Sequence, residues 1–158
     1  MNLKKWKPYI ISIALALGVG TISGLLSMNG MEMYSAFTTK PTLTPPGWLF
    51  SVVWTVLYVL MAISAVMIWQ APAGADRDRG LNLYIAQLIV NFFWSLIFFN
   101  ARAYGFAVIW LLLLWWLVFL MLLQFKKIDS RAAFLQIPYL LWLTFAAYLN
   151  VGVWYLNR

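Results

Sequence analysis

The chain contains no cysteine and no histidine, and only four of its 158 residues are acidic. These absences exclude disulfides, thiol nucleophiles and imidazole bases, and they remove the usual side-chain ligands of zinc and haem iron. Charged residues make up 9% of the chain, against about 25% in a typical soluble domain. A soluble globular fold is therefore not expected.

In place of charge, the sequence has long apolar runs, and 65% of its residues are hydrophobic. The runs are about 20 residues long, which is the length a helix needs to cross ~30 Å of hydrocarbon. We therefore predict an all-α integral membrane protein in which residues 1–158 form a single bundle of five transmembrane helices. The predicted spans are residues 9–28, 47–70, 81–101, 104–125 and 132–156. Of the connections, only residues 29–46 form a long one.

The net charge of +7 is distributed unevenly over the two ends of this predicted bundle. The N-terminal face carries Lys4, Lys5, Lys7, Arg77, Arg79, Lys126, Lys127 and Arg131, and the other face carries Lys40, Arg102 and Arg158. Cytoplasmic loops hold the excess of Lys and Arg, so the N-terminus is predicted inside and the C-terminus outside. Because the cations flank the spans, the positive charge indicates membrane orientation and no nucleic-acid partner.

The third predicted span carries amide side chains. Gln87, Asn91 and Ser95 recur at four-residue spacing, so they share one helix face. Amides at membrane depth are costly unless paired, and this face should point into the protein. Interhelical hydrogen bonding and the lining of a ligand cavity both remain open as interpretations.

Aromatic residues follow the same spacing in the second span, where Phe50, Trp54 and Tyr58 share a face. Trp54 lies about two turns inside the helix, deeper than the interfacial belt that ordinarily holds tryptophan. This face favours one wall of a cavity for a flat guest, and loose packing of bulky helices is the alternative.

The fifth span repeats the pattern, with Trp142, Ala146 and Asn150 on one face. Pro138 precedes them and is expected to kink the helix, because proline removes a backbone donor and clashes with the preceding turn. The first span instead has Ala16, Gly20 and Gly24 at four-residue spacing. Such small residues allow close helix contact, either within the bundle or at a dimer seam.

The long connection ends in "KPTLTPP", which begins at Lys40 and includes Pro41, Pro45 and Pro46. Thr44 is predicted to cap the second span, with Pro45 at its first helical position. Pro41 restricts the residue before it to an extended conformation. A well-made helix start explains the segment, and so does a semi-rigid lid over the outer mouth of the bundle.

Three segments resemble the TspO/MBR family, also called translocator proteins or tryptophan-rich sensory proteins. "KPTLTPPGWLFSVVWTVLY" is similar to the family's proline-rich loop and second helix, "QLIVNFFWSLIFFNAR" to its third span, and "PYLLWLTFAAYLNVGVW" to its fifth. The segments occur in the family's order. The resemblance implies a five-helix bundle, often dimeric, in a bacterial cytoplasmic membrane.

The resemblance also implies a function, in which porphyrins such as protoporphyrin IX and haem bind in a pocket under the first loop. No cofactor, metal or catalytic residue is implied, and the expected partners are porphyrin or another flat hydrophobic molecule, membrane lipid and a second copy of the chain. The pocket residues it implies are Tyr34, Trp54, Tyr58, Gln87, Asn91, Trp142 and Ala146. Leu43 departs from the family, which often has an aromatic residue there. The cholesterol-recognition segment of animal members is out of register here, so cholesterol is not expected.

Three functions follow as hypotheses. The first is a receptor or sensor that binds porphyrin, and it is preferred. The second is a transporter of porphyrin or lipid-soluble metabolites, which a helix broken at mid-depth would favour, with Pro138 as the candidate position. The third is light- or oxygen-dependent porphyrin breakdown. No acid–base or nucleophile constellation indicates hydrolytic chemistry.

Overall fold

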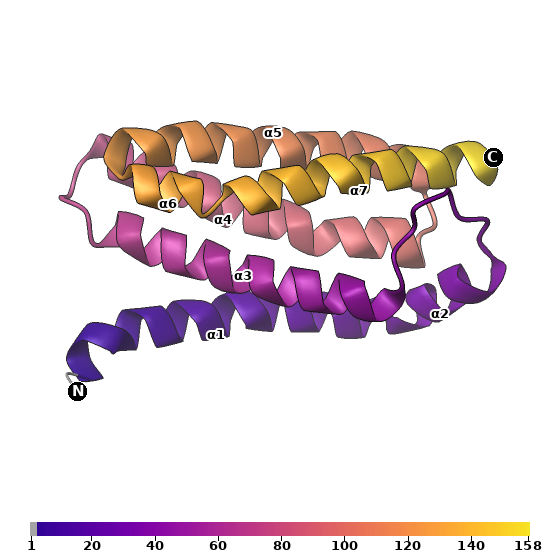
Figure 1. The fold of residues 1–158 in the computed structure, drawn as a ribbon, viewed down its shortest axis with the longest axis horizontal. Coiled ribbons are helices and arrows are strands. Elements are labelled where there is room, and N and C mark those ends of the chain that lie inside the picture. Colours follow the sequence, from indigo (N-terminus) through magenta and orange to yellow (C-terminus); the bar gives the residue numbers. More distant parts are fainter. Residues whose placement is uncertain (1–2) are drawn as a thin grey trace.

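The structure is a computed structural model that describes residues 3–158, with side chains from Lys5 onward, and Met1, Asn2 and the Lys4 side chain lie outside the described part. Every regular element within that part is helical (Figure 1). In chain order the elements are α1 (Leu3–Leu26), α2 (Met28–Phe37), α3 (Gly47–Trp69), α4 (Ala75–Ser95), the π-helical turn η1 (Leu96–Asn100), α5 (Tyr104–Ile128), α6 (Ser130–Phe134) and α7 (Ile137–Leu156).

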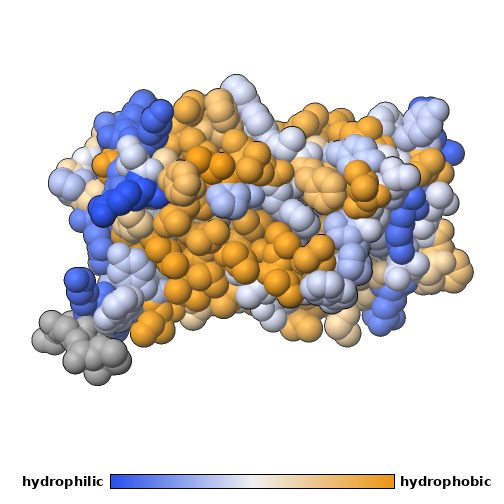
Figure 2. Space-filling model, in the orientation of Figure 1, coloured by the Kyte–Doolittle hydropathy of each residue, from blue (hydrophilic) through white to orange (hydrophobic). Residues whose placement is uncertain are grey.

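Five helical segments are long and apolar enough to cross a membrane, which confirms the predicted five-helix membrane fold. They are Lys5–Leu26, Gly47–Trp69, Ala75–Asn100, Tyr104–Ile128 and Ser130–Leu156. Figure 2 shows a broad hydrophobic band between two more hydrophilic ends. Leu15, Ile109 and Leu141 are each about two-thirds exposed from the protein, as expected for side chains that face lipid.

The connection predicted as a loop over residues 29–46 contains a helix. Ser27 separates α1 from α2, and only residues 38–46 between α2 and α3 are irregular. The α2 helix packs on η1, and Gly30 makes this possible because a Cβ there would lie 2.6 Å from the Phe99 backbone. Sequence periodicity missed α2 because ten residues are too few to show a clear apolar stripe.

The fifth span also differs from its prediction. It begins as the short helix α6, and a turn at residues 135–136 separates α6 from α7. Pro138 is the second residue of α7, where its missing N–H has no helical partner to lose. Pro138 therefore begins a helix and does not kink one, and the interruption lies near the N-terminal end of the span, away from mid-depth.

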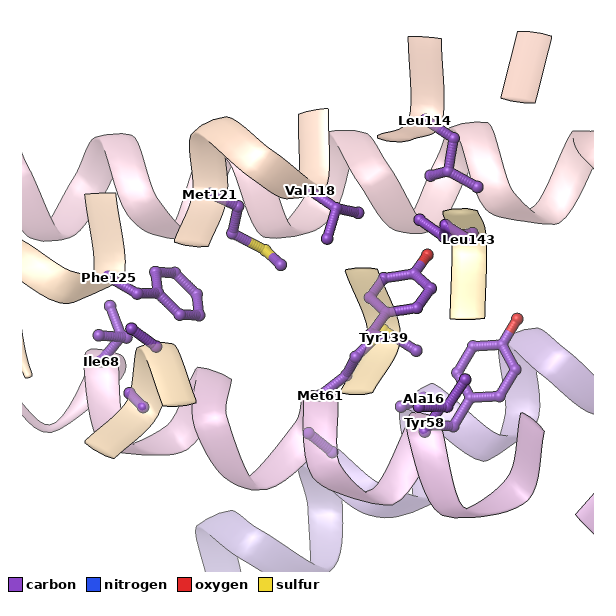
Figure 3. Packing of buried hydrophobic residues seen from close by; sticks show 14 of the residues in the cluster. Ala16, Tyr58, Met61, Ile68, Leu114, Val118, Met121, Phe125, Tyr139 and Leu143 are labelled. Carbon is purple, nitrogen blue, oxygen red and sulfur yellow. The ribbon is translucent and has the colours of Figure 1, made fainter. Parts of the chain in front are cut away.

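The helices pack tightly at one end of the bundle. Ile68 of α3 lies beside Phe125 of α5 in Figure 3, and both are fully buried together with Met121. In this half α3 packs on α6. Toward the other end, which holds α2, the C-terminus and residues 38–46 (Figure 1), α3 and α7 lie farther apart.

Candidate ligand-binding cavity

A cavity of about 960 Å³ occupies the half of the bundle that contains α2. Its walls come from α1, α3, α4, η1 and α7, and α2 with residues 38–46 covers it. Small-molecule sites in proteins usually measure about 300–1,000 Å³, so this cavity lies at the upper end of that range. It is large enough for a bulky polycyclic ligand.

Most of the residues predicted for the site line this one cavity. The predicted residues found in its wall are Tyr34, Trp54, Tyr58, Asn91 and Ala146, together with the lid residues Lys40, Pro41, Pro45 and Pro46. Gln87 and Trp142 do not line it. The structure thus brings the second, third and fifth predicted spans to a common space, and it places two of the predicted side chains behind the wall.

Gln87 is fully buried in a hydrogen-bonded group beneath the cavity. The Tyr139 hydroxyl donates to Gln87 Oε1 at 2.8 Å and accepts from Asn91 Nδ2 at 2.8 Å. Gln87 Nε2 donates to the Met61 sulfur at 3.6 Å. The polar face was expected either to form interhelical hydrogen bonds or to line a cavity. Gln87 does only the first, whereas Asn91 bonds Tyr139 and also lines the cavity.

Trp142 lies outside the cavity, behind Phe50. The two rings meet edge to face with centroids 5.4 Å apart, and Phe50 lines the cavity. Trp142 itself lines a smaller apolar groove of about 480 Å³ between α3 and α7. Its indole Nε1 is buried and has no hydrogen-bond partner in the described part of the chain. Trp142 therefore supports the aromatic wall from the side of the groove.

The aromatic wall of α3 depends on small residues in α1. The rings of Trp54 and Tyr58 lie 5.8 Å apart, and Trp54 also meets Tyr139 at 6.1 Å. A Cβ on Gly20 would overlap the Tyr58 ring, so glycine is required for this approach. Ala16 is buried in the core. At these two positions the small residues serve packing within the bundle.

Several residues of the cavity wall escaped prediction. Trp94 stacks on Phe98 with centroids 5.0 Å apart, and its indole Nε1 donates to Asn150 Oδ1 at 3.2 Å. Phe98 and Phe99 both line the cavity. They belong to η1 and continue the predicted polar stripe of the third span, because Phe98 lies seven positions after Asn91 and Phe99 four positions after Ser95. Helical spacing could therefore have identified both, but the predicted stripe ended at Ser95.

The loop over the cavity is fastened to α7. The backbone N–H of Thr39 donates to Asn157 Oδ1 at 2.9 Å, and Asn157 Nδ2 donates back to Thr39 O at 2.8 Å. The Tyr148 hydroxyl donates to Thr42 O at 3.1 Å. The loop thus has two anchors on the last helix, and its position depends on α7 as well as on its own prolines.

The start of α3 differs from the predicted cap. Pro46 is the N-cap residue of α3, and it makes no side-chain capping hydrogen bond. The Thr44 hydroxyl instead donates to Pro41 O at 2.7 Å, which closes a tight turn within the loop. Leu43 in that turn has φ of 68°, a conformation that non-glycine residues adopt only under local strain. Pro41 rests on Gly152 of α7, where a Cβ would lie 2.7 Å from the proline ring.

The cavity wall carries one charge. Among the described side chains, Lys40 is the only charged one in it, and no acidic one lines it. The Lys40 ammonium lies 5.2 Å from the centre of the Tyr34 ring and donates to Ser35 O at 3.1 Å. Burial raises the pKa of Tyr34 to about 12, so its phenol stays neutral at physiological pH. The rest of the wall is apolar or carries neutral polar groups.

Comparison with known proteins agrees with this architecture. The TspO/MBR family model matches residues 12–156. The tryptophan-rich protein TspO of Chlorobaculum tepidum is 31% identical over 93% of this chain and 94% of the relative. Protein CrtK of Rhodobacter capsulatus is 34% identical over 99% of this chain and 95% of the relative. The translocator protein of Bos taurus is 34% identical over 96% of this chain and 92% of the relative. Because the match extends over nearly the whole chain, the protein belongs to the TspO/MBR family.

Proposed function

We propose that this protein is a membrane receptor of the sensor type that binds porphyrins in the cavity beneath α2 and residues 38–46. The observation that carries the proposal is a large covered space with an aromatic wall and few polar groups, the usual form of a site for an apolar ligand. The name tryptophan-rich sensory protein, carried by a relative from Cereibacter sphaeroides, supports a sensing role.

The wall suits a flat ring system. Trp54 and Phe50 line one side and offer aromatic faces, and aromatic pairs add attraction beyond the area they bury. Asn91 lines the cavity with an amide that orients a polar ring substituent. The chain has no histidine or cysteine to ligate haem iron. We therefore expect metal-free protoporphyrin IX to bind at least as well as haem.

The first test fills the cavity. Ala146 is buried in its wall, so Ala146→Phe places a ring where the ligand would lie. Ala14→Phe adds the same ring on the exposed surface of α1 and serves as the control. In a titration followed by the porphyrin's Soret absorbance, Ala146→Phe should weaken binding more than tenfold, while Ala14→Phe should match the unmodified protein. Equal affinity in all three proteins would show that the cavity is not the porphyrin site.

A second test removes aromatic surface. Trp54→Leu should weaken binding by about 5- to 150-fold, since the loss of an aromatic stacking surface costs roughly 1–3 kcal/mol. Trp116→Leu removes a half-exposed tryptophan that does not line the cavity and controls for hydrophobicity. A matching loss in both variants would contradict the assignment of Trp54.

Transport and porphyrin breakdown make different predictions from binding. Transport requires flux of porphyrin into sealed vesicles that Ala146→Phe abolishes. Breakdown requires that illumination or oxygen convert the bound ring into a defined product, at a rate that falls in Trp54→Leu. Binding without flux and without a defined product supports the receptor function.

We propose that the N-terminus lies inside and the C-terminus outside a bacterial cytoplasmic membrane. The excess of Lys and Arg at the N-terminal end of the bundle supports this orientation. Because the chain lacks cysteine, a single cysteine at Ala73 or at Thr42 provides a unique label. An impermeant thiol reagent added to intact cells should label Thr42→Cys and not Ala73→Cys, and the reverse pattern would invert the topology.

A further inference from the structure

The one charge in the cavity wall has no partner of opposite sign. Lys40 lines the cavity, and no aspartate or glutamate does. The ion pairs among the described side chains join Arg77 with Asp78 and Arg131 with Asp129, both at the opposite end of the bundle. The positive charge of Lys40 is therefore not neutralised by an ion pair within the described part of the chain.

The Lys40 side chain is nevertheless held in place. Its ammonium lies over the Tyr34 ring at 5.2 Å and donates to the carbonyl of Ser35 at 3.1 Å. Ser35 is in the last turn of α2, where carbonyl groups without helical partners attract cations. An ammonium has three N–H donors, so two remain after the bond to Ser35. These donors lie at the rim of an otherwise uncharged cavity.

We propose that the cavity selects flat apolar ligands that carry a carboxylate, and that Lys40 binds this carboxylate at the rim. The proposal rests on the proposed function and names the chemical group that the site recognises. The apolar body of the ligand lies against the aromatic wall of α3, and the acidic end stays beneath the loop. A carboxylate there replaces water around Lys40 with a charge-assisted hydrogen bond. A neutral ligand of the same shape gains nothing from Lys40.

The experiment compares an acid with its ester. Protoporphyrin IX carries two carboxylates, and its dimethyl ester has the same ring without charge. Both are titrated into the unmodified protein, Lys40→Met, Lys40→Arg and Arg158→Met in the same detergent. Arg158 lies at the same end of the bundle but does not line the cavity, so Arg158→Met controls for the loss of one positive charge. Comparing proteins for each ligand separately cancels the different partitioning of acid and ester into micelles.

Lys40→Met should weaken binding of the acid about three- to tenfold, which corresponds to an exposed charge-assisted hydrogen bond. Binding of the ester should change less than about twofold. Lys40→Arg should keep the acid's affinity within about twofold, and Arg158→Met should change neither ligand. Raising the ionic strength from about 0.05 to about 0.5 M should shrink the Lys40→Met effect, because salt screens exposed charges.

Equal effects of Lys40→Met on acid and ester would overturn the inference, since the side chain would then act through packing or the loop. An unchanged affinity for the acid would overturn it too. A second pair, 1-pyrenebutyric acid and its methyl ester, separates this inference from the porphyrin proposal. If porphyrins fail to bind but pyrenebutyrate binds in a Lys40-dependent manner, only the porphyrin assignment fails. If neither acid binds the unmodified protein, the carboxylate inference fails.

Discussion

The two halves of the bundle are built from the same long helices and pack in opposite ways. In the half near the N-terminus, α3 packs on α6, and the small residues Ala62, Ser64 and Ala65 of α3 and Ala132 and Ala133 of α6 are buried. The Ser64 hydroxyl donates to Ala132 O at 2.8 Å, a distance that only close helices allow. Small residues in membrane helices permit such close contact, and they close this half.

In the other half the same helix α3 presents Phe50 and Trp54 in place of alanine and serine. Their side chains line the wall of the cavity, where α3 and α7 do not pack closely. The comparison shows that residue size along one helix sets where the bundle is solid and where it is hollow. Four predictions test it, from the largest expected effect to the smallest.

The first prediction compares one phenylalanine from each half. Phe125 is fully buried in the closed half, so Phe125→Ala should lower the free energy of unfolding by about 3–5 kcal/mol. Phe50 already borders empty space, so Phe50→Ala should cost about 1 kcal/mol, because few packing contacts are lost. Denaturant unfolding in micelles measures both. Similar losses would contradict the division into a solid and a hollow half.

The second prediction concerns the boundary between the halves. Tyr139→Phe keeps the ring but leaves Gln87 Oε1 and Asn91 Nδ2 without their shared partner. Each buried group left unpaired costs about 1–3 kcal/mol, and measured values inside membranes tend to the lower end. Thermal unfolding should show that the free energy of unfolding falls by about 1–3 kcal/mol in total. Tyr148→Phe removes an exposed hydroxyl on the same helix and provides the comparison, with a smaller loss expected.

The third prediction loosens the cover and leaves the walls intact. A side chain at Gly152 would collide with the Pro41 ring, so Gly152→Val should displace residues 38–46. Ligand dissociation, measured by stopped flow, should accelerate about threefold to tenfold. Val151→Ala, at an exposed position beside it, should leave the rate unchanged. A dissociation rate that both variants leave unchanged would show that the loop does not retain the ligand.

The fourth prediction uses pH in the closed half. Asp129 caps α6 by accepting from the Arg131 N–H at 2.8 Å, and its hydrogen bonds to Arg131 lower the pKa of its carboxyl from the usual value. A lowered folded-state pKa stabilises the protein above the unfolded value, and this contribution is lost as pH falls through the folded pKa. As the pH falls below 4, the midpoint temperature of thermal unfolding should therefore fall less steeply in Asp129→Asn than in the unmodified protein. Because Arg131 is exposed, solvent screens the pair and the effect at neutral pH should be small. Ligand affinity should not change.

The sequence predicted the membrane spans and their inward faces well, because both follow from regular residue spacing. Five apolar runs indicated the spans, and the four-residue spacing of Trp54, Tyr58 and Asn91 placed them on inward faces. The polar stripe also held Gln87, but spacing alone does not tell a cavity wall from the layer beneath it. Whether an inward-facing side chain lines the cavity or lies beneath it depends on how closely the neighbouring helices approach. The sequence of one helix does not reveal that distance.

The remaining misses have other causes. Phe98 of η1 continues the helical spacing of Asn91 into the cavity wall, but the predicted stripe ended at Ser95. Neighbouring proline and threonine suggested a cap on α3, yet Thr44 bonds Pro41 within the loop. The partners of the loop, Asn157 and Tyr148, are more than 100 positions away in the sequence, where no local pattern indicates them.

That separation has a consequence for how the protein is made. Thr39 and Asn157 are 118 positions apart, and the contact between them holds the loop over the cavity. Synthesis proceeds from the N-terminus, so four spans are complete before the helix that anchors the loop exists. The hydrogen bonds between Thr39 and Asn157 therefore form only after the end of α7 has been made. Closure of the loop reports that the whole bundle has assembled.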